Sequence, residues 1–112
     1  MNNTDILKKF YAACAVPDPK ACRQLMCDDF TFKGPMMQAS SADEMIERTQ
    51  QMGCAMAFTD VTMAEVGDTV LAFYTCTMGP MSMRAAERVT FKDGRLQSSE
   101  CIYDASAFKD MP

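Results

Sequence analysis

The sequence contains no histidine and no tryptophan. Without histidine the chain lacks the usual general base near neutral pH, the Ser-His and Cys-His nucleophile pairs, and the commonest ligand of transition metals. Its closest cysteines, Cys22 and Cys27, do not have the Cys-x-x-Cys spacing of a zinc site. No glycine-rich loop is present to hold a phosphate. We therefore expect no metal and no cofactor, and any catalysis must use carboxylate, tyrosine, lysine or cysteine side chains.

The sequence also has no long apolar run and no excess of positive charge. Its first five residues are polar, and no apolar stretch approaches the length needed to span a bilayer, so we expect a cytoplasmic protein with no membrane partner. The formal net charge is −4, and the eleven Lys and Arg residues are scattered along the chain. Because this charge repels phosphate backbones, we expect no nucleic-acid partner.

Sulfur-containing residues are abundant in a short chain. The 112 residues are 48% hydrophobic, which suits one core and predicts a single domain over residues 1–112. Most of the six cysteines lie in periodic segments, so we expect them to be reduced and mostly buried. Methionine is flexible and fills irregular spaces, and we expect most of the twelve methionines to fill the core and a few to line an adaptable pocket.

The N-terminal half predicts helices. Asn3 or Thr4 caps the first, which ends before Pro17, and its apolar residues recur at three- and four-residue steps. Asp18-Pro19 pairs a capping residue with proline at the first helical position, which predicts a short second helix closed by Asp28-Asp29. The inward stripe of the first helix comprises Ile6, Leu7, Phe10, Tyr11 and Cys14.

A strand and a third helix follow. Residues 30–32 alternate as a half-buried strand that stops at Gly34-Pro35. Ser41-Ala42-Asp43-Glu44 is a capping box, in which the serine accepts a bond from the third backbone N–H and the glutamate reaches back to the serine N–H. This motif predicts a helix that ends at Gly53.

The C-terminal half predicts an antiparallel meander of four longer strands. Turn signals at Gly67-Asp68, Gly79-Pro80 and Asp93-Gly94 separate them. A change of parity near Asp60 predicts a bulge, and bulges bend sheets. Residues 70–76 are apolar on both faces, so we expect a homodimer partner to cover the sheet. The predicted fold class is α+β, a cone-shaped curved antiparallel sheet wrapped around three helices.

One acidic residue breaks the alternation of the third meander strand. Glu87 falls on the apolar face, which is formed by Met83, Ala85, Val89 and Phe91. A carboxylate in a cavity loses water, and such groups are candidates for acid-base work. The alternative is that Glu87 bonds a buried partner and only stabilises the fold.

The neighbours of Glu87 depend on the hairpin at Asp93-Gly94. A two-residue turn pairs Glu87 with Glu100, whereas a three-residue loop places it near Ser99 and turns Cys101 and Tyr103 to the same face. We favour the three-residue loop, because it keeps two carboxylates apart and places hydroxyl groups beside Glu87.

The order and spacing of these motifs resemble the nuclear transport factor 2-like superfamily. The resemblance covers nearly the whole chain and implies a cone with a pocket at its open end and dimerisation through the sheet. Four segments carry it: Phe10-Tyr11-Ala12-Ala13, Asp28-Asp29-Phe30-Thr31-Phe32 with Gly34-Pro35, Val89-Thr90-Phe91-Lys92-Asp93-Gly94-Arg95, and Tyr103-Asp104.

Within that superfamily the sequence is similar to ketosteroid isomerase and to SnoaL-like cyclases. Ketosteroid isomerase uses an aspartate base together with a tyrosine and a protonated aspartate. The resemblance places Phe10 at the tyrosine, Gly34 at the base and Glu87 at the protonated aspartate. Since Phe10 cannot donate and Gly34 cannot accept a proton, it implies that this isomerisation does not run here by that mechanism. SnoaL-like cyclases use an acidic residue in a similar cavity.

The leading hypothesis is a homodimer that binds a small, largely apolar molecule. As an enzyme it would be an isomerase or cyclase that moves protons within a carbonyl compound, with Glu87 as general acid or base and Tyr103 or Ser99 as donor. The alternative is a noncatalytic ligand-carrying or dimerisation module in which Glu87 is structural. The expected ligand-binding residues are Phe10, Met45, Met52, Phe58, Phe73, Thr75, Ser99 and Cys101.

Overall fold

Helix α1 (Asn3–Ala15) opens the fold and carries the predicted inward stripe. The computed structural model describes residues 2–53 and 55–108. The cap of α1 is Asn2, which precedes both predicted candidates, Asn3 and Thr4, and its side chain accepts a bond from the Asp5 N–H at 2.9 Å. Because four stripe residues are buried, α1 packs its apolar face toward the sheet.

The second helix is shorter than predicted, because the following strand begins sooner. Helix α2 (Pro19–Gln24) starts at the predicted Asp18 cap, which accepts a bond from the Ala21 N–H at 3.0 Å. Strand β1 (Met26–Lys33) then absorbs the acidic pair that was expected to close the helix. Met26 is fully buried in this strand, so tertiary packing overrides its helical spacing.

A short strand and the third helix complete the N-terminal half. Strand β2 (Gln38–Ala39), which the sequence did not predict, pairs with β1, and helix α3 (Ala42–Gln51) follows it. Ser41 accepts a bond from the Glu44 N–H at 3.0 Å, as the capping box predicts. The Glu44 carboxylate reaches back to the Ser40 N–H at 3.2 Å, one residue before the predicted partner.

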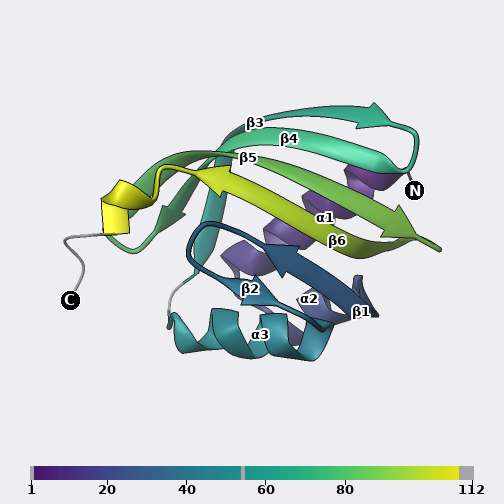
Figure 1. Cartoon of the computed structure of the whole chain (residues 1–112), viewed down its shortest axis with the longest axis horizontal. Coiled ribbons are helices and arrows are strands. Elements are labelled where there is room, and N and C mark those ends of the chain that lie inside the picture. The colour runs from purple at the N-terminus through teal and green to yellow at the C-terminus, as the bar shows by residue number, and fades with distance from the viewer. Residues whose placement is uncertain (1, 54, 109–112) are drawn as a thin grey trace.

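The C-terminal half forms the predicted meander and most of a six-stranded sheet (Figure 1). The sheet order is β2-β1-β6-β5-β4-β3, with β1 joined to β6 in parallel and all other neighbours antiparallel. The chain passes through β2, α3 and three further strands before it returns to β6, and this long connection permits the parallel pairing. The meander strands are β3 (Met56–Val66), β4 (Thr69–Met78), β5 (Met81–Lys92) and β6 (Arg95–Tyr103), and a 3-10 turn (Ala105–Phe108) follows them.

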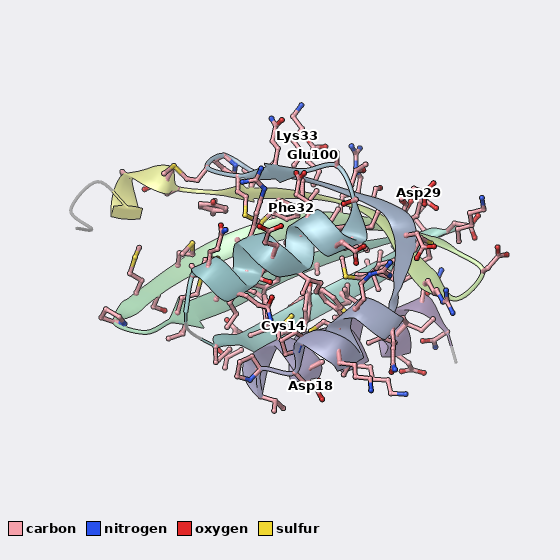
Figure 2. The ribbon with its side chains drawn as sticks, turned by 90° about the horizontal axis from the view of Figure 1, so that it is seen from below. Cys14, Asp18, Asp29, Phe32, Lys33 and Glu100 are labelled. Atoms are coloured by element: carbon pink, nitrogen blue, oxygen red, sulfur yellow. The ribbon has the colours of Figure 1, made fainter. Side chains whose placement is uncertain are left out.

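The sheet bends around the helices at the predicted bulge. The register of β3 against β4 shifts between Thr59 and Thr62, and Asp60 between them has a positive φ of 52°. The three helices lie on one face of the bent sheet, while Lys33 and Glu100 project on the other side, away from the helices (Figure 2). No helix within the described part of the chain is long and apolar enough to cross a bilayer.

Substitution of Phe30 tests whether the inner face of β1 belongs to the core. Its side chain is 2% exposed within β1, whereas the adjacent Thr31 is exposed. Replacing Phe30 with Ala should lower the free energy of unfolding by about 3–5 kcal/mol, because it removes buried apolar surface and leaves a cavity. Thr31→Ala is the control and should change it by less than about 0.5 kcal/mol. Urea unfolding measures both values, and equal effects would contradict the placement of Phe30.

Candidate functional site

The β5–β6 hairpin places Glu87 on the inner face of the sheet. Its turn is Asp93-Gly94, with positive φ at both residues, so the predicted three-residue loop is wrong. A bulge then shifts the register between Thr90 and Phe91, and Glu87 lies opposite Cys101 rather than Ser99 or Glu100. The extra residue in β6 shifts the pairing by one position, so the β6 residues beyond it point to the opposite face from the one that the turn alone would set.

Because of this bulge, Ser99, Cys101 and Tyr103 lie on the same face as Glu87, as expected, although the pairing register differs from the predicted one. Ser99 is buried on the inner face and donates from its hydroxyl to Oε2 of Glu87. Glu100 lies on the outer face and accepts a bond from Arg88 at 2.6 Å. The two carboxylates of the hairpin are therefore on opposite sides of the sheet.

Among the described residues, three hydroxyl groups from three elements donate to the Glu87 carboxylate. Tyr11 of α1 donates to Oε1 at 2.5 Å, Tyr74 of β4 donates to Oε1 at 3.1 Å, and Ser99 of β6 donates to Oε2. A carboxylate offers about four acceptor positions, two on each oxygen. One position on Oε2 is thus left for a further donor.

An aromatic cluster fixes the two phenols. The Phe58 ring stacks on Tyr11 with centroids 4.2 Å apart and meets the edge of Tyr74 at 5.0 Å. Offset and edge-to-face contacts of this kind stabilise ring orientation as well as burying apolar area. This packing holds the hydroxyls of Tyr11 and Tyr74 toward Glu87.

The surroundings keep the phenols and a nearby thiol protonated. Burial, followed by the charge of Glu87, holds the pKa of Tyr11 and of Tyr74 well above its ordinary value of 10.0. Burial also raises the pKa of Tyr103, although a backbone contact with Met36 opposes this effect. Burial, assisted by Glu87, raises the pKa of the Cys101 thiol to about 11.

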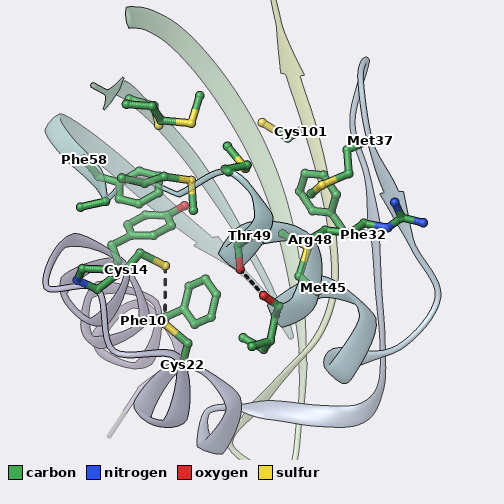
Figure 3. Close-up of a pocket in the computed structure, with 18 of the residues that line it drawn as sticks. Phe10, Cys14, Cys22, Phe32, Met37, Met45, Arg48, Thr49, Phe58 and Cys101 are labelled. Atoms are coloured by element: carbon green, nitrogen blue, oxygen red, sulfur yellow. Dashed lines mark hydrogen bonds between the residues drawn. The ribbon is translucent and has the colours of Figure 1, made fainter. Parts of the chain in front are cut away.

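The cluster forms part of the wall of a cavity of about 810 Å³ (Figure 3). Its charged lining residues are Glu87, Asp18 and Arg48, and most of the remainder is aliphatic, aromatic or sulfur-containing. The methionines in the wall are more numerous than the few that the sequence analysis expected: Met36, Met37, Met45, Met52, Met56, Met78 and Met83.

Comparison with known proteins identifies the family of this chain. The model of the SnoaL-like domain matches residues 7–98, which is more than half of the chain. The chain belongs to the SnoaL-like family. No curated protein matches the sequence significantly.

Solved structures share the fold at low identity. A nuclear transport factor 2-like protein of unknown function from Cytophaga hutchinsonii is 20% identical with a TM-score of 0.85, over 95% of this chain and 93% of that one. A candidate polyketide cyclase from Pseudomonas putida is 13% identical with a TM-score of 0.85, over 96% of each chain. A candidate isomerase from Bacillus subtilis is 18% identical with a TM-score of 0.83, over 98% and 94%.

In this SnoaL-like chain, most predicted site residues lie at the cavity. Ser99 lies behind the wall, where it holds Glu87. The described residues contain no group of three or more Cys, Asp or Glu side chains that could hold a metal ion. The predicted residues in the wall are Phe10, Met45, Met52, Phe58, Glu87, Cys101 and Tyr103.

The placement of Phe73 and Thr75 in the ligand site is wrong. Both lie on the outer face of β4, where the Arg84 guanidinium stacks over the Phe73 ring at 3.9 Å and donates to Thr75 Oγ1 at 3.0 Å. The inner face carries the alternate residues, including Tyr74. Because β4 is apolar on both faces, alternation alone could not choose between them.

Sequence reasoning missed the tyrosines that hold Glu87. The resemblance placed Phe10 at the tyrosine position, but the next residue, Tyr11, reaches the carboxylate. Phe10 lines the cavity instead. The signal was present, because both Tyr11 and Tyr74 fell on predicted apolar faces and a buried tyrosine hydroxyl requires a partner.

The buried tyrosines predict a loss of stability in alkaline solution. Unfolded tyrosines ionise near their ordinary pKa of 10.0, whereas Tyr11 and Tyr74 stay neutral in the folded chain. Their stabilising effect is therefore complete below about pH 10 and falls as the pH rises further. Phenolate absorbance and circular dichroism should change in one transition during alkaline titration. Ionisation of all three tyrosines near pH 10 in a folded chain would contradict this assignment.

Proposed function

We propose that this SnoaL-like chain binds a small, largely apolar molecule that carries one hydrogen-bond donor. The observation that supports the proposal is the Glu87 carboxylate, which lines an apolar cavity and accepts three hydrogen bonds from described residues, one fewer than its capacity. Ligand pockets typically combine predominantly apolar walls with a few fixed polar groups and measure about 300–1,000 Å³. The cavity of about 810 Å³ lies in that range.

The donor requirement follows from the hydrogen bonds of the carboxylate. Tyr11 and Tyr74 fill Oε1, and Ser99 takes one position on Oε2, so a ligand hydroxyl or amine would complete the set. A ligand group that only accepts hydrogen bonds would be repelled here, because its partial negative charge would face the negative carboxylate with no proton to share. The methionine-rich wall favours an apolar body of variable shape, because methionine side chains repack easily.

Proton transfer within a carbonyl compound is the second candidate. The open position on Glu87 Oε2 could take a proton from the carbon beside a carbonyl group and return it to another carbon of the resulting enolate. Tyr103, which lines the same cavity, would donate to the carbonyl oxygen. The names of the neighbours, a candidate polyketide cyclase and a candidate isomerase, agree with this class of chemistry. The rival is a noncatalytic carrier in which Glu87 only anchors or stabilises.

Paired ligands test the anchor. We expect 2-naphthol to bind at least about tenfold more tightly than 2-methoxynaphthalene, because a hydrogen bond to a charged group contributes about 1.5–3 kcal/mol. Glu87→Gln should reduce this preference and leave the affinity for 2-methoxynaphthalene unchanged. Fluorescence titration measures each dissociation constant.

Glu100→Gln is the matched control on the same hairpin. Glu100 lies on the outer face, so its replacement should leave the naphthol preference intact. Equal affinities of both ligands for the unmodified chain would overturn the anchor. A β,γ-unsaturated cyclic ketone separates the two functions. Conversion to the conjugated ketone by the unmodified chain, with loss of this activity in Glu87→Gln, supports proton transfer. Binding without conversion supports the carrier.

We also propose that two copies of the chain pair through the outer face of the sheet. Phe73, Ala86 and Ile102 form one row across β4, β5 and β6, and Leu71 lies in the next row. Leu71, Phe73 and Ile102 are 46%, 49% and 68% exposed. Two ion pairs, Arg84–Asp60 and Arg88–Glu100, flank this apolar patch. Positive and negative groups beside one apolar patch suit the self-complementary contact of a twofold dimer.

Phe73→Glu tests the dimer. The introduced carboxylate would lose water within the patch, and pairing with the neighbouring Arg84 does not repay that cost, so the variant should remain folded and become monomeric. Val66→Glu is the control, since Val66 is 64% exposed at the end of β3 and should leave the dimer intact. Sedimentation velocity at several concentrations measures the state of each protein. A monomeric unmodified chain, or a dimeric Phe73→Glu variant, would contradict the proposal.

A further inference from the structure

Two cysteine thiols meet in the wall of the cavity, on the side formed by α1 and α2. The Sγ atoms of Cys14 and Cys22 lie 3.7 Å apart, and both residues are free and lie among the lining residues (Figure 3). Cys14 is 7% and Cys22 is 5% exposed, so the cavity is their route to small molecules.

The two thiols have unequal environments. Their mutual hydrogen bond is the largest influence on both, and it raises the pKa of Cys14 and lowers the pKa of Cys22. Burial and the charge of Glu87 act further against ionisation of Cys14. Cys22 is therefore the thiol that ionises first, and its thiolate can then accept a hydrogen bond from the Cys14 S–H. Thiolates, and not thiols, attack disulfides.

We propose that Cys14 and Cys22 form a reactive dithiol that exchanges with low-molecular-weight disulfides entering the cavity. In the first step the Cys22 thiolate attacks one sulfur of the disulfide, forms a mixed disulfide, and releases one small thiol after protonation of its thiolate. In the second step Cys14 loses its proton and attacks the Cys22 sulfur. This forms the Cys14–Cys22 disulfide and releases the second small thiol, so the protein loses two hydrogen atoms and the reagent gains them.

Two other described cysteines, Cys101 and Cys27, have different surroundings. The Cys101 thiol lies 3.6 Å from the Tyr74 oxygen, and its pKa is raised to about 11. Cys27 makes long contacts with the Lys92 and Arg95 carbonyl oxygens, and burial raises its pKa. Cys54 lies outside the described residues.

The charges near the dithiol select the reagent for its test. Two of the three charged residues described in the cavity wall are acidic: Asp18 acts on Cys22 and Glu87 acts on Cys14, while Arg48 is the one cation. A small cationic disulfide such as cystamine should therefore enter and react faster than an anionic one. Disulfide formation would connect the end of α1 to α2 and alter the cavity wall beside Phe10 (Figure 3).

The test treats the folded chain with cystamine, stops the reaction with acid, and maps the cysteine peptides by mass spectrometry. The unmodified chain should give the Cys14–Cys22 disulfide. Cys14→Ser should stop at a mixed disulfide on Cys22, because the second thiol is absent. Cys22→Ser should react at Cys14 at least about tenfold more slowly. Cys27→Ser is the control and should behave as the unmodified chain.

Several results would overturn the dithiol. These are persistence of both thiols in the unmodified chain, a disulfide from either residue to Cys54 in place of the predicted one, or equal reaction rates for the two serine variants. If a serine variant does not fold, a time course on the unmodified chain decides. The mixed disulfide must then appear on Cys22 before the Cys14–Cys22 disulfide, and its first appearance on Cys14 contradicts the proposed order.

Discussion

A carboxylate removed from water must find donors within the protein, and this requirement organises the inner side of the fold. Glu87 takes its donors from α1, β4 and β6 through Tyr11, Tyr74 and Ser99. The same three bonds connect the first helix to the middle of the sheet. Because they leave one acceptor position open, the interaction that stabilises the wall of the cavity also provides its polar group.

The two faces of strand β4 present different side chains. On β4, Tyr74 faces the cavity and joins the carboxylate cluster, while the neighbouring Phe73 faces outward beneath Arg84. Successive residues of a strand point to opposite faces, so one segment can contribute to a ligand site and to a proposed dimer surface. The proposed double use would account for the apolar residues on both faces of β4.

Helix α1 concentrates three kinds of chemistry on one side. Phe10 lines the cavity, Tyr11 donates to Glu87, and Cys14 lies one turn further along, opposite Cys22. Cys14 is four residues after Phe10 and three after Tyr11, so the three side chains share one helix face, and all of them line the cavity. A ligand at Glu87 and a reaction at the dithiol would therefore affect the same cavity wall.

The sequence by itself determined the helices, the meander, the bulge near Asp60 and the inward carboxylate at position 87, because these depend on local capping, turn and alternation patterns. The tertiary structure decided which residues surround that carboxylate. The bulge in β6 sets Cys101 opposite Glu87, and the packing of α1 selects Tyr11 rather than Phe10. Pairing register and helix rotation depend on contacts between segments distant in the chain, and no local pattern contains that information.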